Sequence, residues 1–310
     1  MALKMTTTHL LSRTFFPLLP FSSNNLSLPL RTRYRSPFCF SISSMSSESS
    51  PPLTHTITLP GQPVEIVAAP GLTPSDFRNA IECSLFQQWL KNMQGENGAL
   101  TDGVMSLNKV LIQGVDYFGK RVGFLKFKAD IIDKELGKKV PGIVFSRGPA
   151  VAILILLESE GETYAILTEQ VRIPTGRIVL ELPAGMLDDD KGDFMGTAVR
   201  EVEEETGIQL NKKDMVDLTA FLHPSIGGKV FPSPGGCDEE LSVFLYRSQV
   251  GKDTIQQLQG KKTGLHEHGE LIKVHVLPYA QLWRSTADAK VLMAIALYEM
   301  AKRDGLLSEV

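Results

Sequence analysis

Residues 200–208, with the sequence Arg-Glu-Val-Glu-Glu-Glu-Thr-Gly-Ile, constrain the fold more than any other part of the chain. They read as the end of a helix over Phe194–Thr206 that stops at the following glycine. On such a helix Glu201, Glu204 and Glu205 share one face, because residues three and four apart are neighbours. Like charges so placed repel one another, and clustered carboxylate oxygens suit magnesium or manganese. A solvated acidic helix face explains the same pattern, so the flanking residues must decide.

The segment before this helix supplies that decision. Glu181-Leu182-Pro183-Ala184-Gly185 ends a predicted strand, and a loop rich in Asp and Gly leads into the helix. This strand, loop and helix resemble the Nudix box, the signature G-x5-E-x7-R-E-U-x-E-E-x-G-U in which U is aliphatic. The matching positions are Gly185, Arg200, Glu201, Val202, Glu204, Glu205, Gly207 and Ile208. By this resemblance the chain is identified as a member of the Nudix hydrolase family.

The chain departs from the signature at one place. Gly185 and Arg200 lie one residue further apart than the pattern allows, so the first glutamate of the box falls on Gly192. We expect Asp193 or Asp190 to take over its role. Asp193 also suits the N-cap of the helix.

The resemblance implies a role for each matched residue. Glu201 and Glu205 would be metal ligands together with the carbonyl of Ala184, and Glu204 would be a ligand or the partner of one. Arg200 would orient the glutamates by salt bridges. The implied cofactor is Mg²⁺, with Mn²⁺ as a substitute, which would neutralise a diphosphate and hold the attacking water.

A second motif narrows the branch of the family. Ser233-Pro234-Gly235-Gly236-Cys237-Asp238-Glu239 resembles the Ser-Pro-Gly-Gly loop of ADP-ribose and nucleoside-diphosphate-sugar pyrophosphatases. That resemblance implies that Glu239 is the general base, with Glu240 and Glu267 as rivals. It also implies substrate contacts from the glycines Gly185 and Gly235.

Residues 169–172, Glu-Gln-Val-Arg, also resemble this branch. The resemblance implies that Arg172 lies near the substrate phosphates, a task that suits a bidentate guanidinium.

The hydrophobic pattern predicts an α/β fold in which a Nudix α/β/α sandwich with a mixed sheet follows a small β-rich N-terminal subdomain. Short strands are expected over residues 56–59 and 64–67, and a helix follows from Thr73 through the apolar positions that end at Trp89. Longer strands follow over residues 104–113 and 121–131. Further strands are expected at residues 150–157, 163–169, 178–182, 216–222, 241–246 and 272–277, and a final helix at residues 287–303.

The domain boundaries follow from these segments. We expect a transit peptide over residues 1–45, an N-terminal subdomain over residues 46–145 that shapes the pocket and the dimer, and a Nudix domain over residues 146–310. The N-terminal subdomain is too small to bury a full core alone, which favours a homodimer.

The first 45 residues carry five basic and no acidic side chains, and they are rich in Ser and Leu. This composition is typical of an organelle transit peptide and favours the chloroplast stroma. A mitochondrial address, or a cytosolic form that starts at Met45, is the alternative.

The formal net charge is −3, and it would be −8 without that leader. An acidic body argues against nonspecific nucleic-acid binding, and no apolar run is long enough for a membrane span. The three cysteines fit neither a disulfide framework nor a zinc site.

The expected substrate is a nucleotide sugar, and the expected reaction is hydrolysis of its diphosphate bridge. ADP-glucose and ADP-ribose would give AMP and a sugar phosphate. Two alternatives remain at this point: a Nudix hydrolase of another nucleoside diphosphate derivative, such as a UDP-sugar or a dinucleotide, and a catalytically silent Nudix-fold nucleotide-binding protein.

Overall fold

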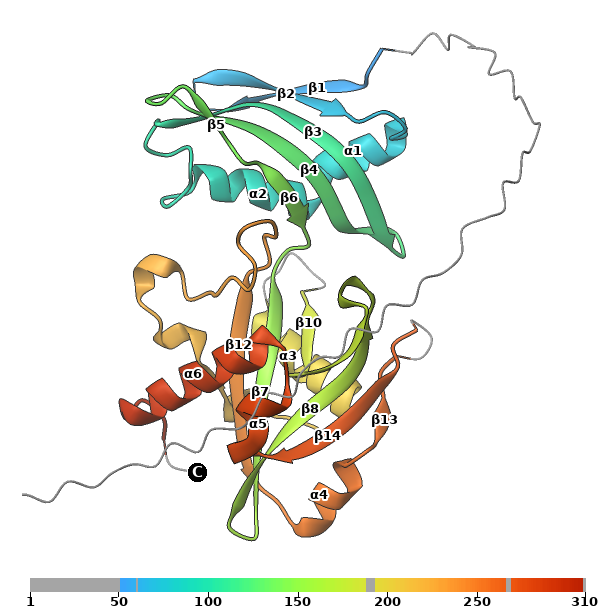
Figure 1. The fold of residues 1–310 in the computed structure, drawn as a ribbon, viewed down its shortest axis with the longest axis vertical. Coiled ribbons are helices and arrows are strands. Elements are labelled where there is room, and N and C mark those ends of the chain that lie inside the picture. Colours follow the sequence, from blue (N-terminus) through green and yellow to red (C-terminus); the bar gives the residue numbers. More distant parts are fainter. Residues whose placement is uncertain (1–50, 60, 188–192, 266–268, 309–310) are drawn as a thin grey trace, which may run out of the picture. The chain divides into compact units, whose positions relative to one another are not determined.

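The computed structural model describes residues 51–59, 61–187, 193–265 and 269–308. The expected leader, Asp190, Gly192 and Glu267 lie outside these ranges. The described chain has a mixed α/β fold with two sheets (Figure 1), as predicted. None of the described helices is long and apolar enough to cross a membrane.

The first sheet has the strand order β1-β2-β3-β4-β5, with β6 also paired to β4. Two helices, α1 (Pro74–Glu82) and α2 (Ser84–Gln94), lie against one face of it (Figure 1). Buried side chains from both layers form one apolar core. The strands are β1 (Thr54–Leu59), β2 (Gln62–Ala68), β3 (Met105–Phe118), β4 (Arg121–Asp133), β5 (Lys138–Val140) and β6 (Ile143–Ser146).

The helix predicted from Thr73 is two helices. Thr73 is the N-cap of α1, where its Oγ1 accepts a hydrogen bond from Asp76 N at 3.1 Å. The helix ends at Cys83, whose extended backbone redirects the chain into α2. Phe86 and Trp89 of α2 then meet Phe127 of β4 edge-on, with ring centroids 5.5 and 4.7 Å away. This aromatic packing favours the break between α1 and α2, because one continuous helix would point the two rings in a different direction.

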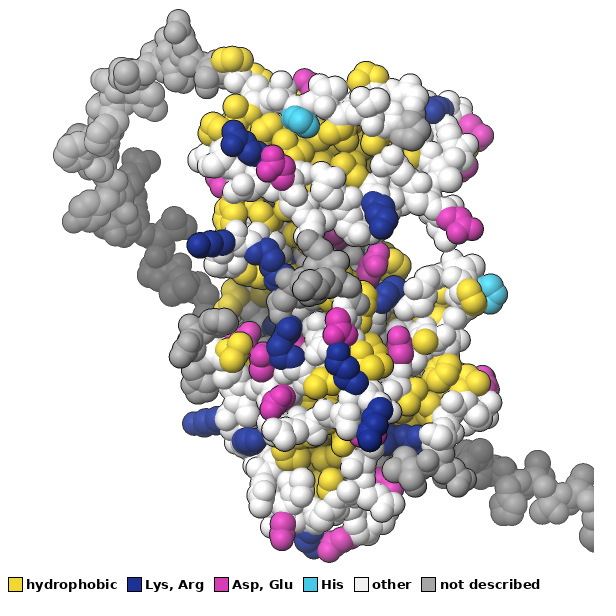
Figure 2. All heavy atoms as spheres, turned by 180° about the vertical axis from the view of Figure 1, so that it is seen from behind, with side chains coloured by type: hydrophobic (Ala, Val, Ile, Leu, Met, Phe, Trp, Pro, Cys, Tyr) yellow, Lys and Arg dark blue, Asp and Glu magenta, His cyan; other side chains and the backbone are white. Residues whose placement is uncertain are grey.

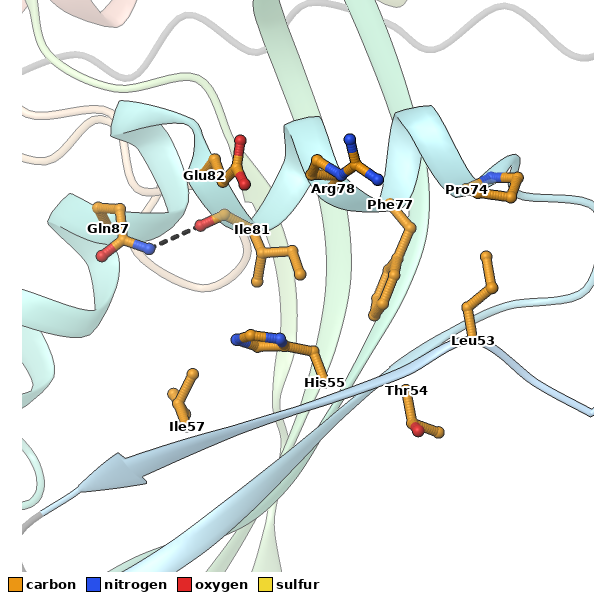
Figure 3. A pocket seen from close by; sticks show the side chains of 10 residues that line it. All are labelled: Leu53, Thr54, His55, Ile57, Pro74, Phe77, Arg78, Ile81, Glu82 and Gln87. Carbon is orange, nitrogen blue, oxygen red and sulfur yellow. Dashed lines mark hydrogen bonds between the residues drawn. The ribbon is translucent and has the colours of Figure 1, made fainter.

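A surface groove of about 390 Å³ lies between β1 and the helices α1 and α2 (Figure 3). His55, Arg78 and Glu82 lie over an apolar floor that includes Phe77 and Ile81. Glu82 is the one carboxylate among its ten lining residues, so the groove lacks the clustered oxygens of a magnesium site.

The second sheet has the strand order β11-β12-β7-β8-β14-β13, with β10 paired to β7 and β9 paired to β8. Strand β12 runs parallel to β7, and the remaining pairs are antiparallel. The strands are β7 (Ala150–Ser159), β8 (Glu162–Arg172), β9 (Arg177–Glu181), β10 (Ala184–Met186), β11 (Met215–Asp217), β12 (Leu241–Gln249), β13 (Lys262–Thr263) and β14 (Ile272–Pro278).

Strand β7 is buried on both faces, as its continuous apolar sequence predicts. Leu154 and its alternate neighbours pack with α5 (Tyr279–Ser285) and α6 (Ala289–Arg303). Ile153 and its alternate neighbours pack with α3 (Phe194–Thr206) and α4 (Lys252–Leu258). The sheet therefore lies between two helical layers, which is the predicted α/β/α sandwich (Figure 1).

Several predicted strands extend further than expected, β3 as far as Phe118, and two other boundaries differ because of local hydrogen bonds. The strand expected at residues 216–222 ends at Asp217, because Asp217 Oδ1 accepts hydrogen bonds from Thr219 N at 2.9 Å and Ala220 N at 3.1 Å and turns the chain into a 3₁₀ helix. The final helix begins at Ala289 instead of residue 287, because Asp288 caps it through Lys290 N at 3.0 Å.

Acidic and basic side chains are intermixed on the face of the molecule shown in Figure 2. That surface matches a chain whose net charge is small. The absence of nucleic-acid binding stays a prediction.

Candidate active site

Helix α3 has the limits that the sequence predicts. Asp193 is its N-cap, and its Oδ1 accepts from Gly196 N at 2.8 Å. The other oxygen, Oδ2, lies 2.7 Å from Lys212 Nζ. The helix ends at Gly207, whose φ of 72° is in the left-handed region that favours glycine. The capping role of Asp193 is confirmed, and its replacement of the first box glutamate stays a prediction.

Helix α3 lies directly against β10, and Glu201 marks the contact. Its carboxylate faces the backbone of Gly185 so closely that a side chain at position 185 would overlap it. Only 16% of the Glu201 side chain is exposed. A glycine at position 185 therefore makes room for a carboxylate of the helix.

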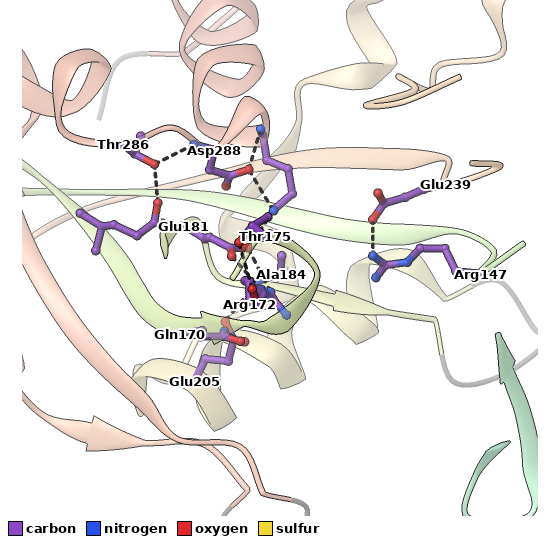
Figure 4. A network of polar contacts seen from close by, with 12 residues as sticks. Arg147, Gln170, Arg172, Thr175, Glu181, Ala184, Glu205, Glu239, Thr286 and Asp288 are labelled. Atoms are coloured by element: carbon purple, nitrogen blue, oxygen red, sulfur yellow. Dashed lines mark hydrogen bonds and ion pairs between the residues drawn. The ribbon is translucent and has the colours of Figure 1, made fainter. Parts of the chain in front are cut away.

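One turn further along α3, Glu205 is buried with 5% of its surface exposed. Its Oε1 accepts from Gln170 Nε2 at 2.8 Å, and its Oε2 accepts from Ala184 N at 3.2 Å (Figure 4). Burial, and then the negative charge of Glu201, raises the pKa of Glu205 from its ordinary 4.5 to about 8. Among the described residues no basic side chain forms an ion pair with Glu205, so a metal ion would relieve the cost of its charge.

The ion pairs expected of Arg200 are present. Its Nη2 lies 3.5 Å from Glu201 Oε1, and its Nε lies 3.8 Å from Glu204 Oε1. Arg200 therefore spans two of the three glutamates.

The residues fit a hard divalent cation. Glu201 and Glu205 bring two repelling carboxylates to the strand end that carries Ala184, and Mg²⁺ prefers such oxygen donors. Within the described ranges no three or more His, Cys, Asp or Glu side chains form a ready-made metal cluster. The fit therefore rests on two carboxylates and on the backbone of β10.

Arg172 ends β8 and is held by a buried carboxylate. Its Nε and Nη2 donate to the two oxygens of Glu181 at 2.7 and 3.0 Å. Lys290 Nζ also donates to Glu181 at 2.9 Å, and to Asp288 at 3.0 Å. Burial alone would raise the pKa of Glu181, but the hydrogen bonds and charges of Arg172 and Lys290 outweigh it and lower that pKa. The Arg172 side chain is still 41% exposed, so its plane is fixed while one edge faces solvent.

The Ser-Pro-Gly-Gly loop is joined to the linker between β6 and β7. Asp238 accepts from Ser146 Oγ at 2.5 Å, from Arg147 N at 2.8 Å and from Gly148 N at 3.3 Å. Glu239 Oε1 then lies 3.3 Å from Arg147 Nη1, with 16% of its side chain exposed (Figure 4). Because Leu241 and Met186 both pair with Ala150, this loop and β10 flank the same end of β7.

The remaining loop residues have separate surroundings. Glu240 Oε1 accepts from Asn92 Nδ2 at 3.1 Å. Within the described ranges, and leaving out the two chain neighbours, no atom lies within 4 Å of a β carbon placed on Gly235, so no described group explains that glycine.

The comparisons with known proteins bear on the family of the chain. A sequence model of the NUDIX domain matches residues 146–295. The chain is 73% identical over 265 residues to "Nudix hydrolase 14, chloroplastic" of Arabidopsis thaliana, a match that covers 84% of this chain and 86% of that protein. The chain belongs to the Nudix hydrolase family.

Two more distant relatives of this Nudix hydrolase are bacterial. It is 34% identical over 160 residues to "ADP-ribose pyrophosphatase" of Haemophilus influenzae, covering 49% of this chain and 64% of that protein. It is 40% identical over 97 residues to "ADP-ribose pyrophosphatase" of Bacillus subtilis, covering 31% and 44% respectively. A solved structure titled "Crystal structure of ADP compounds hydrolase" matches 65% of this chain and 99% of that one, with 18% identity and a TM-score of 0.41.

Family membership makes the chain a hydrolase of nucleotide derivatives, and Nudix hydrolases use divalent metals such as Mg²⁺. The sequence patterns assign no role in the site to three residues that the structure places there, which are Gln170, Glu181 and Lys290. Gln170 lies in the segment 169–172 that resembles the family. Because it stands two residues before Arg172 on a strand, its side chain is expected on the same face as that of Arg172, which could have indicated a place in the site. Glu181 and Lys290 gave no such signal, because Lys290 is 109 residues away in sequence.

Proposed function

We propose that this Nudix hydrolase cleaves the diphosphate bridge of ADP-sugars. Water attacks one phosphorus, the bond from that phosphorus to the bridging oxygen breaks, and the products from ADP-glucose are AMP and glucose 1-phosphate. ADP-ribose gives AMP and ribose 5-phosphate. The convergence of Glu201 and Glu205 on the backbone of β10 supports the reaction type most directly, because an acidic pocket accepts a diphosphate only through a metal ion.

The side chains of the protein position the metal ion and the substrate relative to one another. Glu201, Glu205 and the Ala184 carbonyl would hold the ion, Glu204 would support them, and Arg200 orients Glu201 and Glu204 by its two ion pairs. Bound Mg²⁺ supplies charge neutralisation on the diphosphate and an activated water. Arg172, oriented by Glu181, offers its exposed edge to a phosphate oxygen.

Glu239 is the general base of this proposal. Its loop lies at the same end of β7 as β10, and Asp238 fixes the backbone beside it. Arg147 holds the carboxylate in one direction in the absence of substrate. Glu240 and Glu267 are the rivals; Glu240 contacts Asn92, and Glu267 lies outside the described residues.

Two observations support ADP-sugars over other diphosphates: the Ser-Pro-Gly-Gly loop and the ADP-ribose pyrophosphatase relatives. The plant relative's name includes "chloroplastic", which together with the basic, acid-free first 45 residues supports a plastid address. A plastid location favours ADP-glucose among the ADP-sugars. The catalytically silent alternative is disfavoured, because a binder has no need for repelling carboxylates such as Glu201 and Glu205.

A substrate panel tests the proposal. Purified protein with Mg²⁺ is given ADP-glucose, ADP-ribose, UDP-glucose and NADH, and the products are identified by chromatography. AMP together with glucose 1-phosphate or ribose 5-phosphate, at a kcat/KM above that for UDP-glucose and NADH, is the expected result. A preference for UDP-glucose or NADH would overturn the substrate and leave the family membership standing.

A further inference from the structure

The carboxylate of Glu205 is held on both sides by neutral donors. Gln170 Nε2 donates to one oxygen at 2.8 Å, and Ala184 N donates to the other at 3.2 Å. In its ionised, metal-binding form Glu205 only accepts, so the amide nitrogen of Gln170 is then the atom that faces it. The two donors come from different strands, β8 and β10, and together they fix the plane of the carboxylate against the sheet.

Gln170 reaches Glu205 because of the strand alternation of β8. Ile166 and Thr168 point to the face of the sheet that α3 covers, and Gln170 continues this series. The next residue in the series is Arg172, which is already paired with Glu181. Two donors of Arg172, Nε and Nη2, are therefore engaged by Glu181 and not by Glu205.

The residue type at position 170 matters for this reason. A Lys or Arg there would neutralise Glu205 and compete with a cation, and a Glu would add a third repelling charge beside Glu201. A glutamine orients the carboxylate without an opposite charge that would compete with a metal ion. Outer-shell hydrogen bonds of this kind tune how well a ligand binds its metal.

We infer that Gln170 is a positioning residue for the metal site: it orients Glu205 toward the ion without touching the ion or the substrate. The inference rests on the proposed metal role of Glu205. Loss of the hydrogen bond leaves the ligand in place but frees it to rotate, so metal affinity falls while the chemistry at saturating metal is largely kept.

The test is a Mn²⁺ titration of the full-length protein, followed by the electron paramagnetic resonance signal of free Mn²⁺ in the absence of substrate. Gln170→Met keeps the length of the side chain and removes the donor. We expect its dissociation constant for Mn²⁺ to rise roughly ten- to hundredfold. The Mg²⁺ concentration for half-maximal turnover should rise by a similar factor, and excess Mg²⁺ should restore most of kcat.

Gln62→Met is the matched control. Gln62 Nε2 also donates one partly buried hydrogen bond of 2.8 Å, to Leu107 O in the first sheet. It should lower thermal stability without changing Mn²⁺ affinity, which separates loss of any buried hydrogen bond from loss of this one.

The outcomes distinguish this inference from the proposed function. A Gln170→Met variant that binds Mn²⁺ as tightly as the wild type would overturn the positioning role, whatever the substrate. A wild-type protein that binds Mn²⁺ but leaves ADP-sugars intact would overturn the proposed substrate, while weaker binding by the variant would still support Gln170.

Discussion

A β carbon on Gly185 would stand 2.0 Å from Cδ of Glu201 and 2.2 Å from its Oε1. No real β carbon has such neighbours, so Gly185→Ala must push the carboxylate, and the α3 turn that bears it, away from β10. We expect Gly185→Ala to lose turnover at least about a hundredfold, the scale on which small misplacements of reacting groups act. Steady-state kinetics at several Mg²⁺ concentrations would measure this.

Gly251→Ala is the control for that variant. Gly251 has open space around its missing side chain and a φ of −72° that any residue adopts. Turnover should be unchanged. Normal activity in Gly185→Ala would mean that Glu201 moves aside freely and that the close contact has no role in catalysis.

Glu205→Gln gives the sharpest test of the metal site. It removes the charge of a ligand, so turnover should vanish and the rise in Tm that Mg²⁺ produces in the wild type should be lost. The metal-free variant should be at least as stable as the wild type, because burial and Glu201 both oppose the charge of Glu205. Calorimetry with and without Mg²⁺ provides both readings.

Glu203→Gln on the same helix is the comparison, since Glu203 is exposed and, among the described contacts, its carboxylate accepts only from Gln209 at 3.2 Å. It should retain activity and the Mg²⁺ response. A Glu205→Gln variant with near-normal kcat would remove Glu205 from the metal site.

The local parts of this site were predictable from sequence. Helix α3 begins and ends where the N-cap Asp193 and Gly207 predict, because capping depends on neighbours within a few residues. The contact between Gln170 and Glu205 joins residues 35 apart, and that between Lys290 and Glu181 joins residues 109 apart. Such contacts depend on how strands and helices pack, which no local pattern encodes.

Because local patterns do not encode long-range contacts, the sequence predicts only a phosphate contact for Arg172. A lone arginine near a phosphate-binding strand implies an anionic partner, but the sequence does not reveal that Glu181 occupies two of its donors. In the ladder of β8 and β9, Glu181 pairs with Thr168 and Arg172 with Arg177, so the contact is made by the side chains reaching along the sheet.

Glu239→Gln tests the general base. Loss of a positioned base lowers kcat by roughly 10²–10⁴-fold, and substrate affinity should change little because the carboxylate acts on water. Rapid-quench kinetics at saturating Mg²⁺ isolates the chemical step. If Glu240→Gln or Glu267→Gln is the impaired variant instead, the base belongs to that residue.

Glu181→Gln tests the network that holds Arg172. Removing one partner of a buried ion pair costs roughly 3–5 kcal/mol, and KM should rise because Arg172 loses its orientation. Since Arg172 and Lys290 lower the pKa of Glu181 below its ordinary value of 4.5, the wild-type carboxylate stabilises the fold above that pH. This stabilisation is lost as the pH falls through the lowered pKa. The Tm difference between wild type and variant should therefore be largest at neutral pH and shrink in acid.

The control for Glu181→Gln is Glu65→Gln. Glu65 pairs with Lys109 at 2.9 Å, but both side chains are about half exposed. An exposed pair contributes at most about 1 kcal/mol, so this variant should differ little from wild type at any pH. A Tm difference for Glu181→Gln that stays constant from neutral pH to acid would show that the charge of Glu181 has no part in its effect.

The exposed face of β4 and β6 carries apolar side chains beside Lys126 and Lys128, and we predict that it forms a homodimer interface. Ile143 and Phe145 of β6 are 56% and 51% exposed, and they point the same way because they are two residues apart on a strand. Phe124 on the neighbouring β4 is 38% exposed. Single exposed apolar residues are common, but neighbouring ones on a sheet favour a protein partner.

We predict that light scattering gives a dimer mass at micromolar concentration and that Ile143→Glu gives a monomer. Leu306→Glu places the same charge on a leucine that is 51% exposed outside this sheet, and it should remain dimeric. A wild-type monomer, or a dimer that survives Ile143→Glu unchanged, would exclude this face as the interface.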